Sequence, residues 1–201
     1  MKIVFIGDSI TECGRDKADP QSLGDGYVAI LREKLKNLYE DVRFDFLNRG
    51  VSHDRVADVQ ARIQKDVADE HPDICVVLIG VNDVLRKYDA GASLDFDAVA
   101  ASYEDALKQV KACGAKLIAV EPFLLDVPSK RRLRADFDKL VHIISGIAGQ
   151  YADAYVPLDE MFNGVSQSVG VAAYSADGVH PTHRASRLIA DNIIKKIKLF
   201  L

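Results

Sequence analysis

Short apolar segments alternate with amphipathic ones along the whole chain, and this alternation limits the folds open to it. The apolar segments are Lys2–Ile6, Val42–Leu47, Ile74–Ile79, Lys116–Val120 and Ala154–Val156. Between them, apolar side chains recur at helical spacing, as in Val28, Leu31, Leu35 and Leu38. Strands that alternate with helices form a parallel sheet through right-handed crossovers. The sequence therefore predicts an α/β fold, with a five-stranded parallel sheet and helices on both of its faces.

Length and charge favour one ordinary globular domain over residues 1–201. The net charge of -4 is spread along the chain, so neither a basic tract for nucleic acid nor an acidic tail is expected. The longest apolar runs, such as Ile74–Gly80, are too short for membrane insertion, and we expect no secretory signal. Three cysteines without close pairing predict a reduced, cytoplasmic protein.

Gly7-Asp8-Ser9 directly follows the first predicted strand and enters a helix. In this position the Ser9 hydroxyl lies at the carboxyl edge of the sheet, where ligands bind in open α/β folds. The helix N-terminus there favours developing negative charge. Taken alone, the same residues are typical of a helix N-cap formed by Asp8 or Ser9.

Asp177 lies three residues before His180, just ahead of the last predicted helix. A hydroxyl nucleophile needs a base, and the base needs a group that fixes its tautomer. Asp177 can bind Nδ1 of His180 and leave Nε2 for Ser9. The alternative is an Asp-Gly turn followed by a surface histidine. His180 and His183 are too few for a metal site, and we expect no metal or other cofactor.

Asn48-Arg49-Gly50 follows the second predicted strand, and Gly80-Val81-Asn82-Asp83 follows the third. Acyl transfer builds negative charge on a carbonyl oxygen, which calls for preorganised neutral donors. The N–H of Gly50 and the amide of Asn82 are candidates. Asn and Gly are also ordinary turn residues.

In this order, the four segments resemble the sequence blocks of the SGNH (GDSL-like) hydrolase family, and the resemblance spans nearly the whole chain. It implies a flavodoxin-like three-layer sandwich and a serine esterase that needs no cofactor. By the same resemblance, Ser9 is the nucleophile, His180 the base and Asp177 its orienting carboxylate. The oxyanion hole is formed by the N–H groups of Ser9 and Gly50 and the amide of Asn82.

A narrower similarity, to the intracellular acetyl-xylan (acetyl-xylooligosaccharide) esterases, lies in Gly7–Arg15, Gly26–Val28 and Asn82–Asp89. It implies deacetylation of small sugars and assembly into a homo-oligomer. The chain differs from that branch at Leu85, where tryptophan is expected, and at His53, where glycine is usual. We expect the substrate to contact four side chains, namely Asp8, Arg86, Tyr88 and Phe123.

The sequence thus predicts hydrolysis of small-molecule, short-chain carboxyl esters. Phe123-Leu124-Leu125 is the one compact apolar patch available for an acyl pocket, because Cys13–Gly26 and Asn163–Pro181 are irregular and polar. One alternative is a thioesterase or lysophospholipase of the same family, whose anionic leaving group binds Arg131, Arg132 and Arg134. Another is a non-catalytic flavodoxin-like module that holds a phosphate at the helix N-terminus by Ser9. A role for His53 in the pocket competes with a solvent-facing position.

Overall fold

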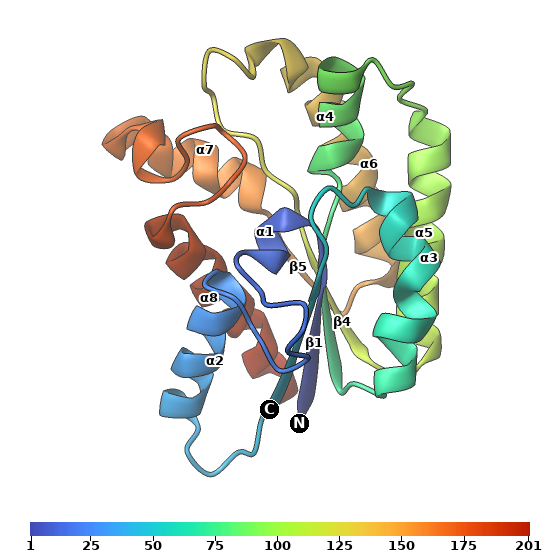
Figure 1. The fold of residues 1–201 in the computed structure, drawn as a ribbon, viewed down its shortest axis with the longest axis vertical. Coiled ribbons are helices and arrows are strands. Elements are labelled where there is room, and N and C mark those ends of the chain that lie inside the picture. The colour runs from blue at the N-terminus through green and yellow to red at the C-terminus, as the bar shows by residue number, and fades with distance from the viewer.

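The computed structural model describes residues 1–201 and has a parallel sheet at its centre (Figure 1). Its strands are β1 (Lys2–Gly7), β2 (Asp45–Gly50), β3 (Ile74–Leu78), β4 (Lys116–Val120) and β5 (Ala154–Val156). They are arranged in the order β2-β1-β3-β4-β5, and every neighbouring pair is parallel. This is the flavodoxin-like order, in which the connections change face at the β1/β3 boundary. The predicted α/β fold is confirmed.

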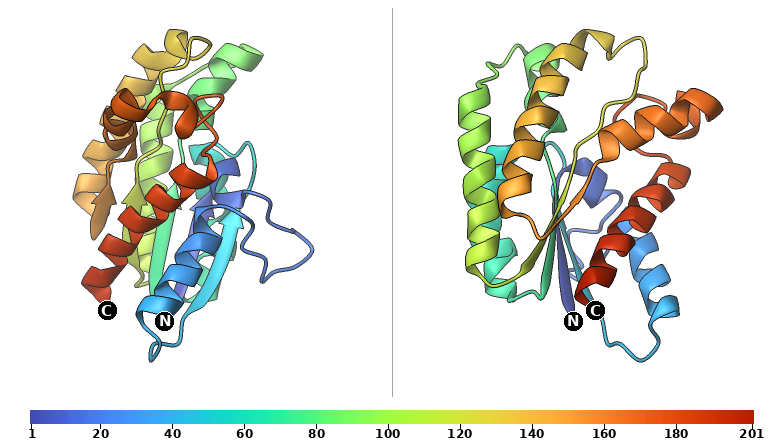
Figure 2. Two further views of the ribbon diagram at one scale, coloured as in Figure 1. Left: turned by 90° about the vertical axis from the view of Figure 1, so that its left-hand side faces the viewer. Right: turned by 180° about the vertical axis from the view of Figure 1, so that it is seen from behind.

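Helices cover both faces of the sheet, as the two views of Figure 2 show. One face carries α2 (Tyr27–Leu38) and α8 (His183–Ile197), which pack against each other. The other carries α3 (Val56–Asp66), α5 (Phe96–Ala112) and α6 (Arg134–Tyr151). Three further helices directly follow strand ends: α1 (Ser9–Glu12), α4 (Val81–Ala90) and α7 (Leu158–Val169). No helix combines the length and the apolarity that crossing a bilayer requires.

Apolar side chains of the helices on both faces pack against the sheet and bury it. Every residue of β3 is buried, as expected for a central strand covered on both faces. The predicted helical stripe on α2 packs inward at Val28, Leu31 and Leu35, but Leu38 is 56% exposed. Leu38 is the last residue of its helix, beyond the sheet that the rest of the stripe covers.

Two predicted boundaries are wrong. The second strand begins at Asp45 rather than Val42 and continues through Gly50, because β1 offers a pairing partner from Lys2↔Asp45 to Gly7↔Gly50. Asn48 and Gly50 are therefore strand residues and do not lie in a loop. Asn163 belongs to α7, so the stretch predicted to be irregular starts only after Val169, where Gly170 has a φ of 91°.

Candidate active site

Ser9, His180 and Asp177 form a chain of hydrogen bonds at the carboxyl edge of the sheet. Ser9 is the first residue of α1, directly after β1, and its Oγ lies 3.1 Å from Nε2 of His180. Nδ1 of His180 donates to Oδ2 of Asp177 over 2.6 Å. With its proton on Nδ1, the imidazole presents an unprotonated Nε2 to the serine hydroxyl. The arrangement has the geometry of a nucleophile, a base and an orienting carboxylate.

Asp177 organises the loop that carries His180. Its Oδ1 accepts hydrogen bonds from the Ser175 hydroxyl at 3.0 Å and from the N–H groups of Val179 and His180 at 2.9 and 2.8 Å. Partial burial alone would raise the pKa of Asp177, but the hydrogen bonds from His180 and Val179 hold this pKa well below its usual range. The carboxylate is therefore ionised at neutral pH and accepts the hydrogen bond from Nδ1 of His180.

The loop that carries His180 packs against the segment that follows β4 and is hydrogen-bonded to it. The N–H of Leu125 donates to the carbonyl of Gly178 over 2.9 Å. Gly178 has a φ of 85°, and a Cβ at this position would lie 2.8 Å from Cγ2 of Val127. The loop ends at Thr182, whose hydroxyl caps α8. These contacts fix the backbone between Asp177 and the last helix.

Asn82 lies in the first turn of α4 with only 8% of its surface exposed. Its Nδ2 donates one hydrogen bond, over 2.9 Å, to the carbonyl of Asp54. An amide nitrogen carries two hydrogens, so a second donor is available to a ligand. Asn82 lines the same cavity as Ser9 and His180, as expected for an oxyanion-hole donor.

Gly50 does not occupy the predicted oxyanion-hole position. Its N–H donates to Oδ1 of Asn48 at 2.9 Å, and Gly50 does not line the cavity of Ser9. A Cβ on Gly50 would lie 2.2 Å from the backbone nitrogen of Glu12, so this glycine allows β2 to approach α1 closely. The prediction for Gly50 is therefore wrong, because its N–H is already used inside the strand end.

The backbone N–H of His53 is a candidate for the donor that the sequence analysis assigned to Gly50. It lines the cavity beside Ser9 and Asn82, and its backbone N–H has no partner within the chain. Its φ of 71° is in the left-handed region, which non-glycine residues rarely adopt. Glycine is usual at this position in the esterases that the sequence resembles. Histidine in place of this glycine was the sequence signal for a special backbone position, because a position that favours glycine often has a positive φ.

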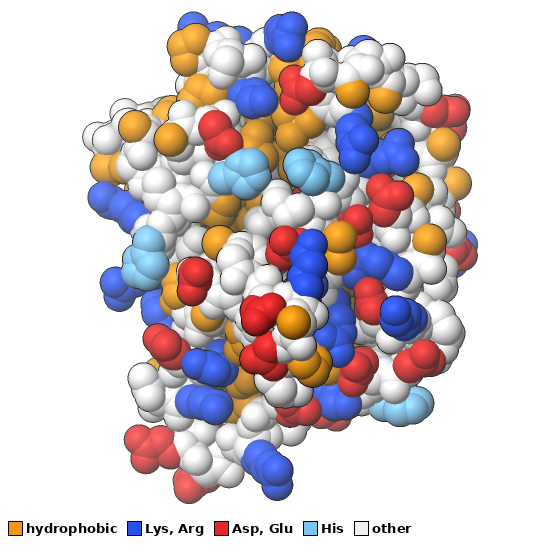
Figure 3. All heavy atoms as spheres, in the orientation of Figure 1, with side chains coloured by type: hydrophobic (Ala, Val, Ile, Leu, Met, Phe, Trp, Pro, Cys, Tyr) orange, Lys and Arg blue, Asp and Glu red, His pale blue; other side chains and the backbone are white.

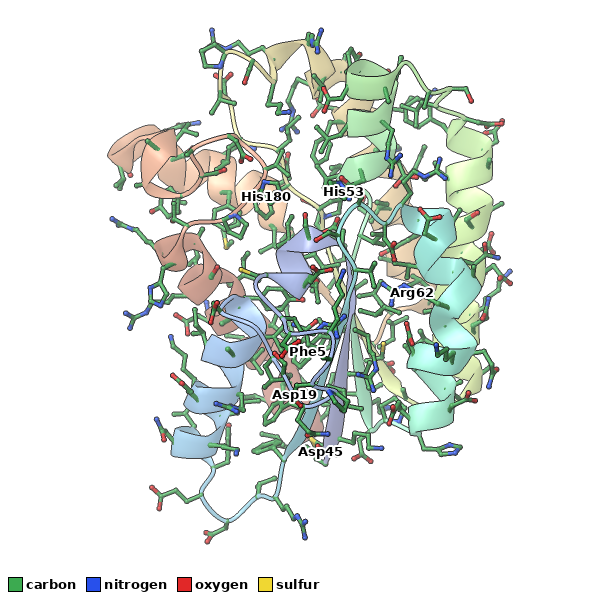
Figure 4. All side chains as sticks on the ribbon, in the orientation of Figure 1. Phe5, Asp19, Asp45, His53, Arg62 and His180 are labelled. Carbon is green, nitrogen blue, oxygen red and sulfur yellow. The ribbon has the colours of Figure 1, made fainter.

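Histidine side chains gather over a hollow on the face shown in Figure 3, and Figure 4 labels His53 and His180 beside each other in the same orientation. The cavity measures about 310 Å³. Arg86 and Lys130 line it, as do the apolar side chains of Leu85 and Val179. Neither Arg86 nor Lys130 forms an ion pair, so both cations are available to a substrate. Of the four predicted substrate contacts, Arg86 alone lines this cavity.

Asp8, Tyr88 and Phe123 are engaged elsewhere. Asp8 is 1% exposed and caps α1 by accepting from the N–H of Ile10, and burial raises its pKa to about 7. The hydroxyl of Tyr88 donates to Asp136 on α6. Phe123 is fully buried, with its ring centroid 4.7 Å from that of Phe162. These three predictions are wrong because burial or a competing partner takes each side chain away from the cavity.

The basic cluster after β4 is already paired with carboxylates. Arg131 binds Asp126 at 2.6 Å, and Arg132 lies 3.9 Å from Asp89. Arg134 forms ion pairs with Asp138 and with the buried Asp159. Arg134 thus anchors α6 to the buried Asp159, whereas the pairs of Arg131 and Arg132 are exposed at the surface. None of the three arginines lines the cavity of Ser9.

Comparison with known proteins agrees with this geometry. Residues 5–188 match the model of the GDSL-like Lipase/Acylhydrolase family. The chain is 30% identical to an acetylxylan esterase of Geobacillus stearothermophilus, over 98% of this chain and 93% of that protein. It is 28% identical to Esterase TesA of Pseudomonas aeruginosa, over 99% of this chain and 89% of that esterase.

The fold of the Geobacillus stearothermophilus esterase superposes with a TM-score of 0.89 at 29% identity, over 98% of this chain and 93% of that one. Solved structures of the same esterase include variants described as catalytic mutants, in which a serine, an aspartate or a histidine is replaced by alanine. In its numbering, the aspartate precedes the histidine by three positions.

Proposed function

This chain belongs to the GDSL-like lipase/acylhydrolase family and hydrolyses carboxylic esters, and we propose that it removes short acyl groups, above all acetyl, from small sugars through an acyl-enzyme on Ser9. The observation that carries the proposal is the hydrogen-bond chain from Ser9 through His180 to Asp177, open to a small polar cavity. The three-residue spacing of Asp177 and His180 equals that of the aspartate and histidine replaced in the acetylxylan esterase variants.

In the first half of the reaction, Oγ of Ser9 attacks the acyl carbonyl as its proton passes to Nε2 of His180. The charge that develops on the carbonyl oxygen is stabilised by the N–H groups of Ser9 and His53 and by Nδ2 of Asn82. Asp177 is ionised, and it stabilises the imidazolium without taking its proton. His180 then gives the proton to the leaving alcohol, which departs and leaves the acyl group on Ser9.

In the second half, water replaces the alcohol. His180 takes a proton from the water, whose oxygen attacks the acyl carbon, and the same oxyanion donors act again. When the bond to Oγ breaks, His180 returns the proton to Ser9 and the carboxylic acid leaves. His180 thus mediates every proton transfer in both halves of the reaction.

The shape and chemistry of the cavity support a small acyl group on a polar alcohol. Leu85 and Val179 are its only apolar lining side chains, so it has no extended trough for a long chain. Each further methylene of a longer acyl chain would contribute about 0.8 kcal/mol to binding only if apolar side chains buried it. Arg86, Asp89 and Lys130 offer donors and acceptors to sugar hydroxyls. Because Arg131, Arg132 and Arg134 do not line this cavity, the arginine cluster does not support the thioesterase or lysophospholipase alternative.

A substrate panel tests the proposal. We expect kcat/KM to be highest for p-nitrophenyl acetate through butyrate and to fall towards palmitate. The kcat/KM for acetylated xylo-oligosaccharides should exceed the kcat/KM for acetyl-CoA and for lysophospholipids. Ser9→Ala should lower kcat by about 10⁴ to 10⁶ and abolish fluorophosphonate labelling, whereas the exposed Ser168→Ala should change neither. A kcat/KM that climbs beyond octanoate contradicts the short-acyl proposal, and activity in Ser9→Ala contradicts the mechanism.

A cytoplasmic location is part of the same proposal. It is supported by Cys13, Cys75 and Cys113, which are all free thiols in the fold. Detection of the protein in fractionated cells of its source would test it.

A further inference from the structure

Arg62 of α3 joins segments of the chain that carry the catalytic groups, although it does not line the catalytic cavity. Its Nε donates to the carboxylate of Asp54 at 2.7 Å, and Nη2 donates to the carbonyl of Gly7 at 3.0 Å. Nη1 donates to the carbonyl of Arg49 and to the carboxylate of Asp66, both at 2.7 Å. The side chain is only 16% exposed. All three nitrogens of the guanidinium are therefore engaged.

Two of these acceptors lie next to groups that the reaction needs. Gly7 is the last residue of β1, two positions before Ser9. Asp54 directly follows His53, and its carbonyl accepts the hydrogen bond from Asn82. In Figure 4, Arg62 lies below His53, on the α3 side of β1. One planar group thus links the backbone that ends in the nucleophile to the loop that presents the oxyanion donors.

The loop needs such support because His53 has a left-handed backbone conformation, with a φ of 71°. A conformation of this kind is unfavourable for a non-glycine residue and persists only where the neighbouring residues are held. Before His53, the N–H of Ser52 donates to Oε2 of Glu12 at 2.6 Å. After it, Asp54 is held by Arg62 and Asn82. Without the guanidinium, Asp54 would keep only backbone and amide contacts.

We propose that Arg62 is a positioning residue, which sets the distance between Ser9 and the His53 N–H by holding Gly7 and Asp54 at the same time. The proposal rests on the proposed function, because it assumes that Ser9 is acylated and that the His53 N–H binds the oxyanion. A planar fork with several donors suits this task, and a lysine ammonium cannot reproduce it.

The first test measures catalysis in Arg62→Ala. Displacement of reacting groups by a mutation outside the cavity can lower the rate by about 10². We expect a fall of that size in kcat for p-nitrophenyl acetate, with KM little changed. The rate of Ser9 labelling by a fluorophosphonate should fall in parallel. Millimolar guanidinium should restore much of the lost kcat by filling the vacated position, a rescue that a general loss of stability would not show.

Arg49→Ala is the matched control. Arg49 is 18% exposed and pairs with Glu70 at 2.7 Å, so its side chain makes a comparable ion pair away from the loop of His53. The Arg49→Ala variant should lose thermal stability but keep the kcat of wild type, and added guanidinium should not change its rate of ester hydrolysis. If Arg62→Ala proves too unstable to assay, Arg62→Lys keeps the charge and stem, and its kcat should still fall well below that of wild type.

A double-mutant cycle with His53→Gly tests the cause. Glycine adopts a positive φ without strain, so its loop depends less on Arg62. We expect the loss from Arg62→Ala to be clearly smaller in the His53→Gly background than in wild type. Additive effects, or a kcat in Arg62→Ala of the same order as wild type, would overturn the proposal. Failure of the proposed function itself would differ: wild type would not hydrolyse the ester, or Ser9→Ala would retain activity.

Discussion

At the scale of single residues, the proposed mechanism assigns proton transfer and hydrogen-bond donation to different groups. His180 is 58% exposed on its side chain, so water can reach it for the second half of the reaction. Asn82 is nearly buried and is held by Asp54, which fixes the direction of its free amide hydrogen. A donor that is oriented before the reaction costs little reorganisation when charge develops.

Asn82→Ala should therefore lower kcat by about 10²–10³ and leave KM much less affected. The physical reason is that the amide binds the developing oxyanion more strongly than the ground-state ester. Steady-state kinetics with p-nitrophenyl acetate measure both constants. Asn82→Asp, which replaces the donor with a negative charge, should lose at least as much kcat. A change confined to KM would reassign Asn82 to ground-state substrate binding.

At the scale of elements, the end of β2 and the short helix α1 pack backbone to backbone. α1 has only four residues, and Asp8 accepts hydrogen bonds from the N–H groups of Ile10, Thr11 and Glu12. Gly50 allows this contact because a Cβ would lie 2.2 Å from the Glu12 nitrogen and 2.6 Å from the Thr11 carbonyl carbon. The side-chain amide of Asn48 secures the same contact through the carbonyl of Thr11.

Gly50→Ala should destabilise the fold by about 1–3 kcal/mol or more, because backbone atoms cannot yield as a flexible side chain would. Urea denaturation of the mutant measures the change in the free energy of unfolding. Gly146→Ala, on α6 with open space around its Cβ position, is the control and should not be destabilised. If Gly50 were only an oxyanion donor, alanine would keep the N–H, and the stability of the fold would hardly change.

At the scale of the whole molecule, two buried carboxyl groups, Asp8 and Asp83, directly neighbour Ser9 and Asn82 in the sequence. Burial raises the pKa of Asp8 from 3.8 to about 7 and that of Asp83 to about 6. A carboxyl group whose pKa is raised by folding favours the native state while it is protonated. This contribution is fully present below the unfolded-state pKa of 3.8 and is lost as the pH rises through the folded-state values.

Asp8→Asn should consequently stabilise the protein at pH 8 and have little effect at pH 4. Asparagine keeps an oxygen that can accept from the N–H of Ile10, so the cap of α1 is retained. The gain should be on the order of 1 kcal/mol or more, since each pKa unit corresponds to about 1.4 kcal/mol. Thermal melts of both proteins from pH 4 to pH 8 measure it. A gain that does not grow with pH would show that Asp8 ionises freely in the native state.

The sequence by itself determined the layers of the fold and the residues that meet at the sheet edge. Hydrophobic periodicity is a local property, and it predicted the strands and helices closely enough to place Ser9 and the loop of His180 at one edge. The three-residue spacing of Asp177 and His180 predicted their contact, because both lie in one short loop. The catalytic roles of these residues are still proposals.

Only the tertiary structure decided which N–H faces the cavity and which side chains reach it. Gly50 and His53 lie in the same segment, but the Gly50 N–H donates to Oδ1 of Asn48, whereas the N–H of His53, a residue with a left-handed φ, has no partner within the chain. Phe123 is apolar enough for a pocket wall, but Phe162 from a distant helix buries it. The direction of a backbone donor and the burial of a side chain depend on partners far away in sequence. Local patterns carry no information on those partners.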